Sequence, residues 1–283
     1  MQNIQQYGVF MTVENRREVF NIANKMDLNI FHFARGTYPL ANGDFVKLPF
    51  NRFFVPIFDS GDTRSYIRDD NDNFFLTPGN IYFVPGGHTA AFFLTDELRF
   101  ISIQFTLELY KGIDVFSRLH KSYCIHNTVL KNRVEAAFAL ENPYAAAAAV
   151  RSVTSELAAC LLGSMSAEQI GQTSKFTGFQ EIIEYIQEHC TAATTVDELA
   201  ALYGSTRENF SRRFSAVFNC SPKQHLNNAI TRKAAEMLLK TPLLNKEIAS
   251  KLGFANEFYF SRFFKKNTGY SPALFKKKPL ENR

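Results

Sequence analysis

Two similar segments about 50 residues apart occupy the last third of this 283-residue chain. The first begins Leu199-Ala-Ala-Leu-Tyr-Gly204 and closes at Ser221-Pro222. The second begins Ile248-Ala-Ser-Lys-Leu-Gly253 and closes at Ser271-Pro272, with one additional residue after its glycine. An internal repeat of this length indicates that one supersecondary unit is built twice.

Each segment has the composition of a helix-turn-helix. In both, a short helix with a small alanine ends at a glycine, because a tight turn favours a residue that tolerates positive φ. The next helix places phenylalanines at positions i and i+4 on one face, which we expect to face the core. Its opposite face carries residue types that contact base edges or phosphates in a major groove. These candidate DNA-binding residues are Arg207, Glu208, Ser211 and Arg212 in the first segment and Asn256, Glu257, Ser261 and Arg262 in the second.

The stretch between the two segments, Pro222 to about Lys240, predicts a single helix with an apolar stripe. About 20 residues at 1.5 Å each span ~30 Å, which is close to the ~34–36 Å of one turn of B-DNA. A rigid helix of this length would hold both reading helices in successive major grooves on one DNA face. A single chain would then read a bipartite target that need not be palindromic.

Charge divides the chain at the same place. Residues 1–169 hold 15 Lys and Arg against 17 Asp and Glu, whereas residues 170–283 hold 17 against 10. A basic C-terminal part behind a slightly acidic remainder indicates a module that binds a polyanion. A solubilising surface with a lysine-rich tail would give the same balance, so charge alone leaves both interpretations open.

The first part of the chain reads as strands followed by helices. Aromatic and β-branched runs alternate with turns from about residue 8 to residue 108, which predicts an antiparallel sandwich or small barrel. Helices are predicted over Thr128–Glu141 and from Pro143 to about Leu162, and their apolar stripe fits either a domain core or a dimer seam. The predicted strands are Asn29–Arg35, Arg52–Phe58, Asn73–Leu76, Ile81–Val84, Ala90–Leu94 and Arg99–Thr106.

One segment of this region, Pro78-Gly-Asn-Ile-Tyr-Phe-Val-Pro-Gly-Gly-His88, is similar to the second motif of cupin barrels. The first cupin motif supplies metal ligands, but Phe50–Tyr66 contains no histidine, so we expect no metal site. His88 is then either a turn histidine bonded to the backbone or a hydrogen-bond donor to a small molecule in the barrel. Strand alternation points further polar side chains inward, where a polar ligand would supply their partners. The tentative ligand-binding residues are Arg52, Tyr82, His88 and Gln104.

Residues 248–272, Ile-Ala-Ser-Lys-Leu-Gly-Phe-Ala-Asn-Glu-Phe-Tyr-Phe-Ser-Arg-Phe-Phe-Lys-Lys-Asn-Thr-Gly-Tyr-Ser-Pro, resemble the signature of the AraC/XylS family of bacterial transcription regulators. The first segment departs from it at Asn219, where glycine is usual and where asparagine tolerates the left-handed conformation, and at Phe210, where leucine is common. The resemblance implies a cupin-like effector-binding and dimerisation domain over residues 1–165, a linker over 166–177 and a double helix-turn-helix domain over 178–283. It also implies binding to promoter DNA and RNA polymerase, a homodimer, and control by a small-molecule effector such as a sugar or related carbon compound. Carried over by position, the base contacts of the family add Phe258 to the DNA-binding residues. Phe258 is unusual on such a face, where it either touches thymine methyl groups or packs.

Several other classes of function are disfavoured. The four cysteines form no Cys-x-x-Cys pair, no catalytic triad or phosphate loop stands out, and we expect neither an enzyme nor a cofactor. Scattered cysteines, no signal peptide and no uninterrupted apolar run of membrane-spanning length indicate a cytoplasmic protein without a membrane partner. Two alternatives remain: a cupin-type enzyme with a helical accessory domain, which metal analysis would reveal, and a helical interaction adaptor, which would not select DNA sequences.

Overall fold

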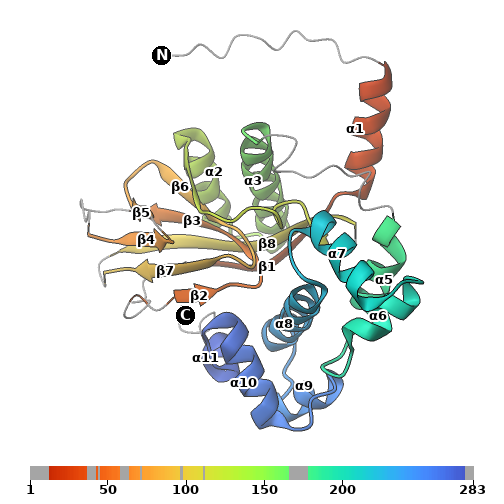
Figure 1. Cartoon of the computed structure of the whole chain (residues 1–283). Coiled ribbons are helices and arrows are strands. Elements are labelled where there is room, and N and C mark those ends of the chain that lie inside the picture. Colours follow the sequence, from red (N-terminus) through yellow and green to blue (C-terminus); the bar gives the residue numbers. More distant parts are fainter. Residues whose placement is uncertain are drawn as a thin grey trace.

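The computed structural model describes residues 13–277 apart from 37–42, 44, 58–63, 71, 96–97, 111 and 166–177. An N-terminal β-rich part lies between two of its own helices and the C-terminal helices (Figure 1). The linker expected at residues 166–177 falls outside the described residues. Two sheets and two groups of helices therefore carry the architecture that follows.

The β part consists of two antiparallel sheets. The six-stranded sheet has the order β1 (Asp27–Gly36), β8 (Arg99–Tyr110), β3 (Asn51–Ile57), β6 (Asn80–Val84) and β10 (Tyr123–His126), with β9 (Ile113–Asp114) paired to β8. The four-stranded sheet has the order β2 (Phe45–Lys47), β7 (Thr89–Phe93), β4 (Tyr66–Asp69) and β5 (Asp72–Phe75). The six predicted strands correspond to β1, β3, β5, β6, β7 and β8, and the predicted antiparallel β domain is confirmed.

Side-chain alternation in β3 builds two separate cores. Phe54 packs with Phe92 and Phe100 in the core shared with the four-stranded sheet. Phe53 and Val55 point to the other face, in the core that includes residues of α2 and α3. Successive strand residues face opposite sides of a sheet. Because both sides of β3 are covered by a core, residues 51–56 are all buried, and their sequence shows no alternation of polar and apolar side chains.

Helices α2 (Thr128–Phe138) and α3 (Pro143–Gly163) cover the six-stranded sheet. Asn127 and Asn142 cap them, and Pro143 occupies the first turn of α3, where its missing N–H costs nothing. Among the described helices, α3 alone is long and apolar enough to cross a membrane by length and composition. Its apolar stripe of Val153, Leu157 and Leu161 is instead buried in the sheet core.

The C-terminal part is helical: α5 (Gln180–His189), α6 (Val196–Leu202), α7 (Arg207–Phe218), α8 (Pro222–Lys240), α9 (Asn245–Lys251), α10 (Glu257–Thr268) and α11 (Pro272–Lys277). The helix predicted over residues 222–240 is α8, with the same bounds. The chain also forms α1 (Val13–Lys25), where the sequence predicted only strands and turns, and that prediction is wrong. None of the described side chains of α1 is fully buried, and Phe20 is exposed. The sequence of this helix therefore shows no apolar stripe that would have predicted it.

Candidate nucleic-acid interface and interdomain cavity

The first helix pair is α6 with α7. Thr195 and Glu198 form a capping box at the start of α6, and Gly204 in the turn has a φ of 70°. Thr206 then caps α7 by accepting a hydrogen bond from the Asn209 N–H. Phe210 and Phe214 of α7 are fully buried, as their spacing predicted.

The second helix pair, α9 with α10, repeats this arrangement. Gly253 in its turn has a φ of 73°, and Phe260 and Phe264 are fully buried. Asn256 caps α10, because its side-chain oxygen accepts hydrogen bonds from the Phe258 and Tyr259 N–H groups at 3.0 and 3.1 Å. The sequence placed Asn256 among the DNA-binding residues, and the structure gives its side chain a capping role as well.

The remaining candidate DNA-binding side chains lie on the outer faces of α7 and α10, opposite the buried phenylalanines. Ser211 and Ser261 are half-buried, and the other candidates are exposed. Arg207 forms an exposed ion pair with Asp197 at 2.9 Å, and an Arg212 N–H donates to the Asn209 side-chain oxygen at 3.0 Å. Both contacts lie at the surface, where such contacts contribute little to stability. Arg207 and Arg212 can therefore exchange these contacts for contacts to a ligand.

Arg52, Tyr82 and His88, the first three tentative ligand-binding residues, are buried and bonded within the β part. Arg52 Nε donates to Ser102 Oγ at 2.9 Å, and its guanidinium lies 5.3 Å from the centre of the Phe92 ring. The Tyr82 hydroxyl donates to the Phe75 carbonyl at 2.6 Å. His88 Nε2 bonds to the Asp69 carboxylate, which also accepts from the Ser122 N–H.

Gln104 differs from these three because its buried side-chain oxygen has no hydrogen-bond partner. The register places it between Arg52 on β3 and His32 on β1. Burial, assisted by the Arg52 charge, lowers the pKa of His32 to about 4. This row of strand neighbours could bind one polar group at Gln104, but Arg52 and Tyr82 already have partners in the protein.

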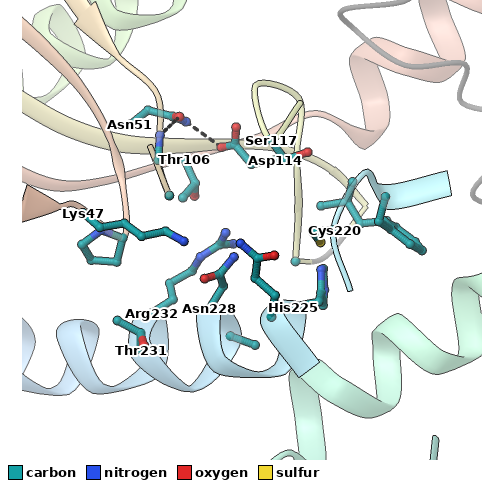
Figure 2. A pocket seen from close by; sticks show the side chains of 18 of the residues that line it. Lys47, Asn51, Thr106, Asp114, Ser117, Cys220, His225, Asn228, Thr231 and Arg232 are labelled. Carbon is teal, nitrogen blue, oxygen red and sulfur yellow. Dashed lines mark hydrogen bonds between the residues drawn. The ribbon is translucent and has the colours of Figure 1, made fainter. Parts of the chain in front are cut away.

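A cavity of about 140 Å³ lies between the β part and α8. Lys47 from β2 and Arg232 from α8 point toward the same space, with Asn228 beside Arg232 (Figure 2). Burial lowers the pKa of Lys47, and none of the described residues forms an ion pair with it. Arg232 reaches across the domain boundary to Glu108 at 2.8 Å.

The cavity wall also holds two titratable groups, the buried Asp114 and the half-buried His225. Burial raises the pKa of Asp114 to about 6, although Arg232 and hydrogen bonds from Leu107, Phe116 and Asn51 oppose that rise. Burial and, to a smaller extent, the Arg232 charge together lower the pKa of His225 to about 4. At neutral pH His225 is therefore neutral and Asp114 is largely ionised, and Lys47 and Arg232 supply the positive charges of the lining.

Comparison with known proteins places these features in one family. A helix-turn-helix domain model matches residues 199–278. The uncharacterised regulator YijO of Escherichia coli is 25% identical over 71% of this chain and 74% of its own length. The regulator YfiF of Bacillus subtilis is 32% identical over 34% of this chain, and the match spans only 30% of YfiF. ToxT of Vibrio cholerae, with an unsaturated fatty acid bound, has a similar fold over 87% of this chain and 95% of its own, with a TM-score of 0.59 at 12% identity. The chain is thus similar to helix-turn-helix transcription regulators of the AraC/XylS type.

The departures of this chain from the AraC/XylS signature keep the fold intact. Asn219 adopts the left-handed conformation, with a φ of 54° and a ψ of 24°, at the C-cap of α7, which confirms the prediction made for it. Its side-chain amide also bonds to His120 Nε2 of the N-terminal part at 2.7 Å. The Phe210 ring fills the core beside Tyr203 and Phe214.

Sequence reasoning missed the cavity between the β part and α8. Lys47 and Arg232 are far apart in the chain and belong to no shared motif, so no local pattern joins them. The one usable signal was the polar face of the helix over residues 222–240, where Asn228 and Arg232 are four residues apart.

Proposed function

We propose that this protein binds promoter DNA through the outer faces of α7 and α10 and regulates transcription in response to a small acid held in the interdomain cavity. The observation that carries the DNA-binding proposal is the repeated helix pair, in which equivalent positions of α7 and α10 are exposed while the phenylalanines opposite them are buried. The excess of lysine and arginine in residues 170–283 supplies attraction to phosphates. Activity in the cytoplasm, homodimer formation and contact with RNA polymerase belong to the same proposal.

The chemistry of the exposed residues matches a major groove. An arginine binds guanine through O6 and N7, and a carboxylate accepts from the N4 amino group of cytosine. We call the short DNA sequences bound by α7 and by α10 the two boxes. Arg212 and Arg262 would therefore each bind a guanine, one in each box, and Glu208 would bind a cytosine in the α7 box. The 19 residues of α8 span about 28 Å, which suits two helices that enter grooves one turn apart.

Selection of duplexes from a random pool tests this proposal. We expect two short boxes about one helical turn apart, each with a guanine. Arg212→Ala or Arg262→Ala should cost about 1–3 kcal/mol of specific binding and relax the base preference in one box only. Arg133→Ala is the control, because Arg133 is an exposed arginine of α2, outside the proposed interface. A pool without enriched sequences would favour the adaptor alternative.

The cavity favours an anionic effector. Lys47 is half-buried, its ammonium has no anionic partner among the described residues, and Arg232 stands across the same space. Solved structures of ToxT carry two carboxylic acids, an unsaturated fatty acid and a naphthyl butenoic acid. A carboxylate between Lys47 and Arg232 would compete with Glu108 for Arg232, and so link ligand binding to the contact between the two domains.

Thermal unfolding with carboxylic acids and matched neutral sugars tests the effector. A ligand at 100 times its Kd should stabilise the folded state by about 2.7 kcal/mol, and Lys47→Met should abolish that stabilisation. Gln104→Leu separates the two sites, because it removes the unpaired oxygen of the barrel and leaves the cavity unchanged. Loss of ligand binding in Gln104→Leu alone would place the effector among Arg52, Tyr82, His88 and Gln104 instead.

A further inference from the structure

The helices α7 and α10 carry the same residue at four of their twelve positions and differ at the other eight. The buried pairs Phe210 with Phe214 and Phe260 with Phe264 fix the correspondence at an offset of 50 residues. At that offset, a serine and an arginine recur at 211 and 212 and at 261 and 262. The second residue of each helix differs: it is Glu208 in α7 and Phe258 in α10.

Phe258 does not pack against the protein. Its side chain is 72% exposed, more than any other large hydrophobic residue among the described residues of the C-terminal part. The Asn256 cap fixes the first turn of α10, so the exposure follows from the helix orientation. Because side chains at i and i+4 share a helix face, Phe258 lies on the face that carries Arg262.

The exposed ring suits one group in a major groove. Thymine carries a C5-methyl group there, which is the apolar feature of the base edges, whereas a carboxylate at the same position suits the cytosine N4 amino group. We propose that Phe258 reads the methyl group of a thymine in the box bound by α10, at the step where Glu208 reads a cytosine in the box bound by α7. The two boxes then differ in sequence, so the DNA target is asymmetric and the protein binds it in one orientation. This inference rests on the proposed DNA-binding function.

Removal of one methyl group from the DNA tests the inference directly. The selected duplex is compared with duplexes in which single thymines are replaced by deoxyuridine, which keeps the base pair and loses the C5-methyl. One replacement in the α10 box should weaken binding about four-fold, the worth of one buried methyl group. In Phe258→Ala, the thymine and deoxyuridine duplexes should bind equally, while the guanine preference of Arg262 is retained.

Two further variants sharpen the result. Tyr259→Ala is the matched control, because Tyr259 is the adjacent, 59% exposed aromatic residue of the same turn and should leave the discrimination intact. Phe258→Glu reproduces the α7 side chain and should change the preferred base from thymine to cytosine. Selected boxes that bind thymine and deoxyuridine equally would overturn the inference and leave the proposed function standing. Failure to select any boxes would overturn both.

Discussion

The C-caps of the two reading helices show how one backbone requirement is met by different residues. Asn219 and Gly269 both adopt positive φ, at 54° and 84°. A Cβ atom at Gly269 would lie 3.0 Å from Val46 Cγ1 and 3.2 Å from the Phe45 carbonyl oxygen. Asparagine therefore fits the first position, whereas close approach of β2 restricts the second to glycine.

This difference predicts an asymmetric result when the two residues are exchanged. Gly269→Asn should lower the free energy of unfolding by about 1–3 kcal/mol, the usual cost of overpacking. Asn219→Gly keeps the left-handed conformation and loses the bond to His120, so its cost should stay near 1 kcal/mol. Urea unfolding of both variants measures the two losses in free energy of unfolding, and His120→Ala is the control for the lost hydrogen bond. Equal destabilisation by the two exchanges would contradict the packing explanation.

Acid sensitivity also has its origin in single residues. The pKa of His225 is lowered to about 4, so its stabilising contribution is present above about pH 6.5 and is lost as the pH falls toward 4. The pKa of Asp114 is raised to about 6, so protonation below that pH favours the folded state. The two contributions oppose each other between pH 6 and 4, and His32 adds to the loss.

The pH dependence of the free energy of unfolding should separate these groups. We expect His225→Gln to lose less stability than the unmodified protein between pH 6.5 and 4.5, because the buried neutral imidazole is gone. Asp114→Asn should lose more, because the proton that it would bind on folding is gone. Denaturant titrations at a series of pH values give both slopes. Parallel curves for His225→Gln and the unmodified protein would show that His225 is not the acid-sensitive group.

At the scale of elements, the sequence was informative where apolar residues form a run or a stripe. The aromatic and β-branched run at Arg99–Thr106 predicted β8, and the apolar stripe of residues 222–240 predicted α8. Helix α1 and the short strand β2 escaped prediction because local periodicity is weak where few side chains are buried. The proposed DNA-binding faces of α7 and α10 were inferred from the repeat, whereas the cavity joins residues that only the tertiary fold brings together.

Helix α8 is the element that sets the distance between the two reading helices. Its buried residues Leu226, Ile230, Ala234 and Leu238 belong to the C-terminal core, which holds it rigid. Insertion of five base pairs between the selected boxes moves one box to the opposite DNA face. Affinity should then fall to that of a duplex with one box, as measured by fluorescence anisotropy. Unchanged affinity would mean that the two helices are not held at a fixed separation.

At the scale of the whole molecule, the two parts share a core as well as a cavity. Phe50 and Ile113 of the N-terminal part are buried in the same cluster as Ile186 and Phe264 of the C-terminal helices. Phe50 stacks on Phe31 with ring centroids 4.1 Å apart. Apolar burial of this kind joins the two parts more firmly than the largely buried ion pair between Glu108 and Arg232 does.

Truncation of Phe50 should therefore uncouple the two parts. We expect the unmodified protein to unfold in one calorimetric transition and Phe50→Ala to unfold in two, because the lost ring, worth about 3–5 kcal/mol, joins the domains. Phe53→Ala is the matched control: Phe53 is equally buried but lies in the N-terminal core with Phe83 and Phe105. It should lower the melting temperature without splitting the transition. If Phe50→Ala still melted as one unit, the shared core would not be what couples the effector cavity to the reading helices, and the polar contacts of Arg232 and Asn219 would carry that coupling instead.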